Sequence, residues 1–205
     1  MDKFFYENKY YAAGCKYVAG VDEVGRGPLA GPVVCAAVIM PRGDIIAGAD
    51  DSKKLTASKR TALAKIIKDR AVCYNIAAVS EKEIDEINIL QAVRKCMEKA
   101  VKGLTIMPDI TLVDGLDTRL DLNAEYIVKG DSKSYSIACA SILAKVYRDE
   151  LMEGYSLKFP EYGFERNKGY GTAYHIQAIK EKGACELHRV TFIKKFLAER
   201  EKTGR

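Results

Sequence analysis

Two neighbouring carboxylates, Asp22 and Glu23, stand where an apolar run gives way to a turn. A glycine-flanked arginine, Gly25-Arg26-Gly27, follows them closely. Valine, tyrosine and glycine bounded by a Gly/Pro turn are typical of a short buried strand. Because neighbouring side chains on a strand point to opposite faces, we expect the pair to share a site only if the strand ends or bulges there. A strand that ends in a solvated acidic turn is the alternative.

Two further β-type segments each bring an aspartate to or near a carboxyl end. They are residues 109–115, with Asp114, and residues 125–131, with Asp131. In open α/β sheets, sites form outside the carboxyl ends of strands. Four carboxylates gathered there repel one another unless a cation lies among them, and oxygen ligands without His or Cys favour Mg²⁺ or Mn²⁺. Two such ions roughly 3.5–4 Å apart stabilise both oxygens of a phosphodiester displacement.

Other segments must form the scaffold that positions these carboxylates. Residues 33–40 are continuously apolar and predict an interior strand. Residues 71–79 predict another strand, and Ser80 with Glu83 three residues later predicts the start of a long helix. A second long helix is expected from residue 132 to about 154, and a last one from 191 to about 201. The alternation predicts the α/β class.

Asp149 and the two histidines could also belong to a metal or catalytic site, but we do not expect them in the carboxylate cluster. Asp149 follows Asp131 by 18 residues on an expected helix. At about 1.5 Å per residue the two lie roughly 25 Å apart, too far to share a metal ion. We expect Asp149 to pair with Arg148 or Lys145. The two histidines stand away from the carboxylate segments, and neither is expected to be catalytic.

Composition limits the class of protein and its surroundings. The 205 residues suit one domain, 48% are hydrophobic, 30% are charged, and the net charge of +5 suits a polyanionic partner. Six scattered cysteines without a C-x-x-C motif indicate free thiols in a reducing cytoplasm. No signal peptide is evident, and no apolar run approaches the about 20 residues of a membrane helix. We expect a cytoplasmic protein without membrane contact, and a monomer.

A series of motifs is similar to those of type 2 ribonucleases H, and of ribonuclease HII in particular. They are D-E-V-G-R-G-P-L-A-G-P-V from residue 22, D-S-K-K-L at 51–55, V-D-G at 113–115, K-G-D at 129–131, I-A-C-A-S-I-L-A-K-V-Y-R-D at 137–149 and N-K-G-Y-G-T at 167–172. The matches run in order over roughly residues 17–195. Each motif alone is weak, but together they are highly specific.

The resemblance implies a fold and an activity. The fold is ribonuclease H-like, a central mixed β-sheet flanked by helices, in a single catalytic domain of residues 1–205. Residues 1–16 would form an N-terminal arm, and about 155–205 a C-terminal helical extension that carries the Gly-Tyr-Gly motif. The activity is a metal-dependent endonuclease, with Mg²⁺ or Mn²⁺. It hydrolyses the RNA strand of RNA/DNA hybrids and cuts 5′ of single ribonucleotides in duplex DNA, leaving a 3′-hydroxyl and a 5′-phosphate.

The resemblance also implies roles for particular residues. The catalytic and metal-binding set is Asp22, Glu23, Asp114 and Asp131, and the substrate-binding set is Gly25, Arg26, Gly27, Lys53 and Tyr170. Without the resemblance, Lys53 would be a solvated lysine and Tyr170 a ring packed over a turn. The intact glycine-arginine-glycine motif favours ribonuclease HII over ribonuclease HIII. A DNA-specific nuclease of the same fold, a non-catalytic hybrid-binding protein and a metal-binding structural domain are the rival interpretations.

Overall fold

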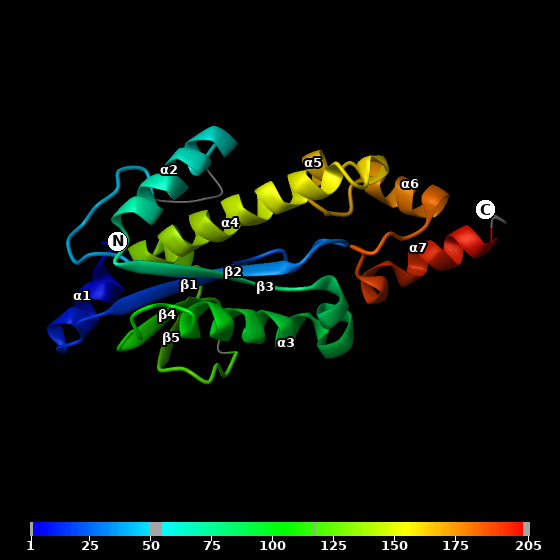
Figure 1. Cartoon of the computed structure of the whole chain (residues 1–205). Helices are drawn as coiled ribbons and strands as arrows, with labels where there is room; N and C mark the ends of the chain where they lie inside the picture. The colour runs from blue at the N-terminus through cyan, green and yellow to red at the C-terminus, as the bar shows by residue number, and fades with distance from the viewer. Residues whose placement is uncertain (1, 50–54, 117, 203–205) are drawn as a thin grey trace.

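A five-stranded mixed sheet forms the centre of the molecule (Figure 1). The structure is a computed structural model that describes residues 2–49, 55–116 and 118–202. The strands are β1 (Val18–Val24), β2 (Val33–Ile39), β3 (Cys73–Val79), β4 (Ile110–Asp114) and β5 (Ala124–Ile127), in the order β3-β2-β1-β4-β5. The β1–β2 and β2–β3 pairs are antiparallel, and the β1–β4 and β4–β5 pairs are parallel. The predicted mixed sheet is confirmed.

Helices cover both faces of the sheet. In Figure 1, α2 (Ala57–Arg70) and α4 (Tyr135–Ser156) lie on one face, and α3 (Glu81–Lys102) lies on the other. A short helix, α1 (Phe5–Ala12), precedes β1. The 3₁₀ turn η1 (Gly130–Ser132) links β5 to α4. After α4 the chain forms η2 (Pro160–Tyr162), α5 (Phe164–Asn167), α6 (Ala173–Lys182) and α7 (Val190–Lys202).

Strand β2 explains why the sheet needs helices on both sides. All seven of its residues are buried. Val33, Cys35 and Ile39 belong to the apolar cluster under α3, and their neighbours Val34 and Val38 to the cluster under α2 and α4. Alternation on a strand therefore sends apolar side chains into two cores. This confirms the predicted interior strand and accounts for its continuous apolar sequence.

The predicted helix starts are borne out at the capping residues. Ser80 Oγ accepts a hydrogen bond from the backbone N–H of Glu83 at the start of α3. Within α3, however, Asn88 has a φ of 67°, so the helix is kinked there. The Asn88 side chain accepts from the N–H groups of Leu90 and Gln91 and begins the helix again. The apolar periodicity continues across the kink, so the sequence pattern alone predicts one unbroken helix.

Helix α4 packs on β1 at an unusually close approach. A Cβ on Gly20 would lie 2.2 Å from the backbone carbon of Ser136, so only glycine fits at this point. Gly20 and Asp22 share the face of β1 that α4 covers, whereas Ala19 and Val21 pack in the α3 cluster. The contact thus fixes α4 above the strand that carries Asp22.

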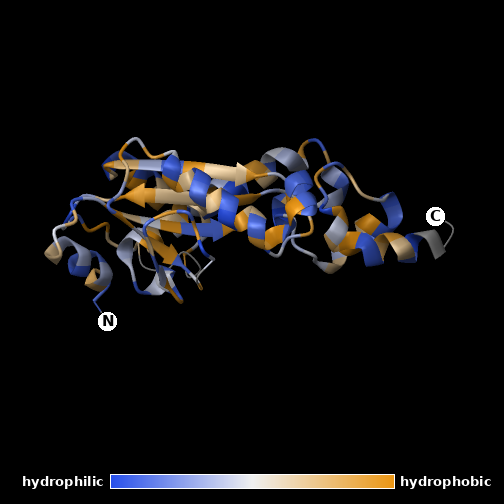
Figure 2. Ribbon diagram, turned by 90° about the horizontal axis from the view of Figure 1, so that it is seen from below, coloured by the Kyte–Doolittle hydropathy of each residue, from blue (hydrophilic) through white to orange (hydrophobic). Residues whose placement is uncertain are grey.

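The C-terminal helices extend beyond one end of the sheet, as Figure 2 shows. They have an apolar cluster of their own, which includes Tyr162, Phe164, Ile179 and Ile193. Ala30 and Met152 also belong to this cluster and connect it to the β1–β2 turn and to α4. Among the helices in the described part of the chain, none combines the length and the apolar character that a bilayer crossing requires.

Candidate active site

A cavity of about 500 Å³ lies where β1 and β4 end beneath α4. Three of the four predicted carboxylates line it: Asp22, Glu23 and Asp114. Tyr170, which comes from the loop before α6, also lines it. The remaining lining residues are Val24, Leu55, Arg60, Ser141 and Lys145. The structure therefore brings together residues that are as much as 148 positions apart in the chain, from Asp22 to Tyr170.

The register of the sheet explains how two adjacent carboxylates reach one cavity. The parallel pairing of β1 with β4 stops at Val21 and Val113, whereas β1 continues to pair with β2 as far as Val24. On the β4 side, Asp22 and Glu23 therefore lie beyond the paired part of the sheet. The strand shows no bulge at the pair and ends at Val24, one residue after Glu23. This free edge gives both carboxylates access to the cavity.

Burial and neighbouring charges together raise the pKa values of two carboxyl groups in the cavity. Burial raises the pKa of Asp22 well above its usual value, and the charges of Glu23 and Asp114 raise it further. Burial also raises the pKa of Glu23, while Arg26 opposes the shift and Asp114 adds to it. Arg26 Nη1 lies 3.2 Å from Glu23 Oε1. The cavity thus favours either protonation or a bound cation over three free negative charges.

The fourth predicted carboxylate, Asp131, is held near this cavity but does not line it. Asp114 Oδ1 accepts a 2.5 Å hydrogen bond from the backbone N–H of Gly130, the residue before Asp131. Asp131 itself is buried in η1. We expected it at the end of a strand, but β5 ends at Ile127. Lys129 then adopts a left-handed conformation, which turns the chain into η1. Asp131 is therefore brought near the cavity by the 3₁₀ turn η1 rather than by the end of a strand.

The donor set is suited to a hard divalent cation. In residues 2–49, 55–116 and 118–202, no three carboxylate, imidazole or thiol groups already converge as ligands of one ion. The acidic groups that line the cavity offer only oxygen, which Mg²⁺ and Mn²⁺ prefer. A cation between Asp22 and Asp114 would remove the repulsion that raises the pKa of Asp22. The residues present therefore fit a metal ion of this class.

Helix α4 contributes two cavity residues that the sequence analysis did not select. The Ser141 hydroxyl donates a hydrogen bond to Asp22, which partly offsets the rise in the pKa of that carboxyl. Lys145 lies one turn later and pairs with Asp149, with 2.6 Å between Nζ and Oδ1. This confirms the expected partner of Asp149. Ser141 and Lys145 are four residues apart, a spacing that places both on one helix face and was available in the sequence.

Known proteins are similar to this chain over nearly its whole length. The family model described as Ribonuclease HII matches residues 19–195. The ribonuclease HII of Chlamydia caviae is 51% identical over 193 residues, which cover 94% of this chain and 91% of the relative. The chain belongs to the ribonuclease HII family. The ribonuclease HII of Acetivibrio thermocellus is 52% identical over 199 residues, 96% of this chain and 77% of the relative.

A solved structure agrees with the family assignment. The ribonuclease H2 from Pyrococcus horikoshii superimposes with a TM-score of 0.78 at 28% identity, over 91% of this chain and 99% of that chain. Ribonucleases HII are metal-dependent endonucleases. As a member of this family, the enzyme hydrolyses the RNA strand of RNA/DNA hybrids. It also cuts 5′ of single ribonucleotides in duplex DNA, and its cleavage leaves a 3′-hydroxyl and a 5′-phosphate.

Four of the five predicted substrate-binding residues lie in two neighbouring groups. Gly25 has a φ of 93°, a left-handed conformation that favours glycine. A Cβ on Gly27 would lie 3.9 Å from Cε1 of Tyr170, so the ring of Tyr170 faces the glycine-arginine-glycine turn. Arg26 and Tyr170 are both substantially exposed. Lys53 lies outside the described residues.

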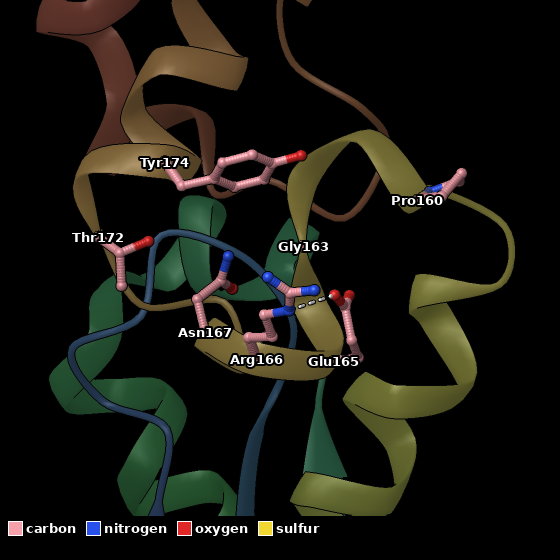
Figure 3. A pocket seen from close by; sticks show the side chains of 7 residues that line it. All are labelled: Pro160, Gly163, Glu165, Arg166, Asn167, Thr172 and Tyr174. Carbon is pink, nitrogen blue, oxygen red and sulfur yellow. Dashed lines mark ion pairs between the residues drawn. The ribbon is translucent and has the colours of Figure 1, made fainter.

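A second cavity, of about 520 Å³, is lined by residues of η2, of α5 and of the start of α6 (Figure 3). Pro160, Gly163, Glu165, Arg166, Asn167, Thr172 and Tyr174 line it. Its one carboxylate, Glu165, pairs with Arg166 across 3.4 Å, as the dashed line in Figure 3 marks. The Tyr174 ring is exposed along one wall. This cavity lacks the carboxylate cluster that phosphodiester cleavage requires.

Proposed function

We propose that the enzyme cleaves its substrate in the cavity lined by Asp22, Glu23 and Asp114, and that Asp131 completes the metal-binding set. The observation that carries the proposal is that Asp22, Glu23 and Asp114 line one cavity in which Asp22 is buried, and the pKa of Asp22 is raised there by burial and then by the charges of Glu23 and Asp114. Such a buried cluster is stabilised when a divalent cation is present. The oxygen-only donors favour Mg²⁺ or Mn²⁺, and the four carboxylates suffice for two ions.

The bound ions would supply an activated water and would stabilise charge on the phosphate and on the leaving oxygen. The protein's own residues hold and orient that site. Ser141 donates to Asp22, and the N–H of Gly130 donates to Asp114, so two of the carboxylates are kept in fixed positions. Arg26 pairs with Glu23 at the edge of the cavity. These contacts support an arrangement that needs little rearrangement when substrate binds.

Selectivity for RNA is assigned to the turn Gly25–Gly27 and to Tyr170. A protein distinguishes RNA from DNA by contacts to the 2′-hydroxyl. Backbone groups of a glycine-rich turn can approach a ribose closely, because glycine has no Cβ. The Tyr170 ring beside Gly27 supports a shared ribose-binding surface. Lys53, by family resemblance, contacts a substrate phosphate.

The domain number, the oligomeric state and the cellular compartment are also proposals. Residues 1–205 would act as a single catalytic domain and as a monomer. Cys35, Cys73, Cys96 and Cys139 are buried free thiols in the core, which supports action in the reducing cytoplasm.

The test is a cleavage assay on a labelled DNA duplex that contains one ribonucleotide, with Mg²⁺ or Mn²⁺. An all-DNA duplex controls for RNA selectivity. Asp114→Asn removes a proposed metal ligand, and Asp121→Asn removes an exposed carboxylate that pairs with Lys102. We expect a cut 5′ of the ribonucleotide by the wild type and by Asp121→Asn, and a loss of at least about 100-fold for Asp114→Asn. Equal rates for both variants would refute the site assignment.

A further inference from the structure

A buried arginine, Arg189, contacts the backbone carbonyls of the turn Gly25–Gly27, which we propose binds the ribose. Arg189 precedes α7, and its side chain is fully buried. Its Nη2 donates to the carbonyl oxygen of Gly25 at 2.6 Å, and its Nη1 donates to that of Arg26 at 2.9 Å. Its Nε and Nη2 donate to the carbonyl of Gly31 at 3.0 and 2.8 Å. Within the described residues, all four hydrogen bonds of this guanidinium reach backbone carbonyls.

Burying a guanidinium in this way costs free energy of desolvation. A buried charge normally has a carboxylate partner. The hydrogen bonds of the Arg189 guanidinium go to carbonyls, and although the charges of Glu81 and Asp85 act favourably on it, the charge of a second fully buried arginine, Arg148, opposes them. Burial, with the charge of Arg148 as the next cause, lowers the pKa of Arg189 to about 9. A planar guanidinium is one of few groups that can hold several carbonyls in a fixed geometry.

The direction of the carbonyls determines the direction of the amides. The peptide bond is planar and trans, so the N–H of each residue points opposite to the carbonyl that precedes it. The carbonyls of Gly25 and Arg26 point to Arg189. The N–H groups of Arg26 and Gly27 therefore point away from it. These are the amides of the turn that faces the Tyr170 ring.

Hydrogen bonds of the backbone at and after Arg189 hold this residue in position. Its backbone N–H donates to the carbonyl of Leu29 at 2.8 Å. The next two residues begin α7, and the partly exposed carboxylate of Asp85 accepts from their backbone N–H groups, at 2.6 Å from Val190 and 3.0 Å from Thr191. The position of Arg189 thus depends on a contact between α3 and α7 that lies outside the cavity.

We propose that Arg189 is a positioning residue for ribose recognition, which fixes the outward direction of the Arg26 and Gly27 amides through their preceding carbonyls. The inference rests on the proposed function, in which the turn Gly25–Gly27 reads the 2′-hydroxyl. It adds that ribose selectivity depends on a buried residue that does not touch the substrate. Arg189 would therefore affect selectivity more than affinity for duplex DNA.

The experiment compares binding with and without the 2′-hydroxyl. In an Asp114→Asn background, which prevents cleavage, fluorescence anisotropy gives Kd for a duplex with one ribonucleotide and for the same duplex in all-DNA form. Arg189→Lys keeps the charge but loses the planar fork. We expect it to reduce the ratio of the two Kd values toward one, by about tenfold for one lost ribose hydrogen bond. The all-DNA Kd should change less than about twofold.

Asp109→Ala is the control for general loosening. Asp109 accepts from the backbone N–H groups of Lys16 and Tyr17 at 2.7 and 2.8 Å, before β1 and at the opposite end of that strand from the turn Gly25–Gly27. We expect it to lower the melting temperature and to preserve the Kd ratio. An equal loss of ratio in both variants would mean general loosening and would overturn the inference.

A second variant keeps the test decisive if Arg189→Lys does not fold. Asp85→Ala removes a partly exposed cap of α7, so we expect a folded protein with a partial loss of the Kd ratio. If Arg189→Lys folds and its Kd ratio is unchanged, the inference is overturned and the proposed function still stands. If Arg189→Lys does not fold, an unchanged Kd ratio in Asp85→Ala has the same meaning. If the Asp114→Asn background shows no preference for the ribonucleotide, the ribose-reading part of the proposed function fails first, and the inference fails with it.

Discussion

Acidification should unfold this protein through a pair of buried histidines. His175 and His188 are both almost completely buried. The backbone N–H of Cys185 donates to Nδ1 of His188 at 2.9 Å, which leaves the proton of that ring on Nε2. This Nε2 lies 3.0 Å from Nε2 of His175, whose Nδ1 then donates to the carbonyl of Tyr170 at 2.9 Å. The network fits only two neutral rings.

The size of the effect follows from the pKa values. Burial, and then the neighbouring His175, lower the pKa of His188 from 6.5 to about 4. Burial also lowers the pKa of His175. Between these pH values the unfolded chain binds more protons than the folded one, so the free energy of unfolding falls as the pH falls from 6.5 to 4. The difference for His188 corresponds to about 3 kcal/mol. Asp22, with its raised pKa, opposes this trend.

Urea unfolding at a series of pH values from 8 to 4 measures the effect. His188→Gln removes the titrating ring and retains both a donor and an acceptor. We expect the variant to be less stable at pH 8 but to lose about 3 kcal/mol less than the wild type between pH 6.5 and 4. Because Asp22 is present in both proteins, its contribution cancels. Parallel pH profiles for the two proteins would refute the reasoning.

Three further outcomes are expected, two from contacts that position or border the cavity and one from a helix cap outside it. Gly20→Ala should destabilise the fold by at least about 2 kcal/mol and lower the cleavage rate, because its Cβ would clash with the backbone of Ser136; urea unfolding with normal stability would contradict this. Ser80→Ala should cost about 1 kcal/mol in urea unfolding and leave kcat unchanged, since the cap lies outside the cavity, and a changed kcat would count against that separation. Lys145→Met should raise KM and weaken its salt dependence, because a cation beside the carboxylates is lost; steady-state kinetics with an unchanged KM would argue against a substrate contact.

Part of the architecture follows from local sequence signals. The apolar run of β2 indicated an interior strand, Ser80 indicated the start of α3, and the placement of Asp22 and Asp114 beside apolar β-type segments indicated a shared edge of the sheet. These signals suffice because each depends on neighbours in the chain. Local spacing also offered Arg148 or Lys145 as a partner for Asp149, and the structure shows the pair with Lys145.

Other features depend on contacts between residues that are distant in the chain. The residue types involved do not indicate which partner they contact. Arg189 contacts the carbonyl of Gly25, 164 positions earlier, and any residue type offers a carbonyl. The two histidines stand 13 positions apart and meet only because α6 and the segment before α7 pack together. Asp131 reaches its place through the left-handed backbone of Lys129 rather than through a strand. Tertiary packing, not sequence pattern, determines these contacts.

The central claim is that the carboxylates of the cavity bind the divalent ions used in cleavage. The most direct measurement is Mn²⁺ binding, followed by electron paramagnetic resonance of the free ion, for the wild type, Asp22→Asn and Asp121→Asn. We predict saturable binding by the wild type and by Asp121→Asn, and at least about tenfold weaker binding by Asp22→Asn. The same affinity in all three proteins would contradict the account.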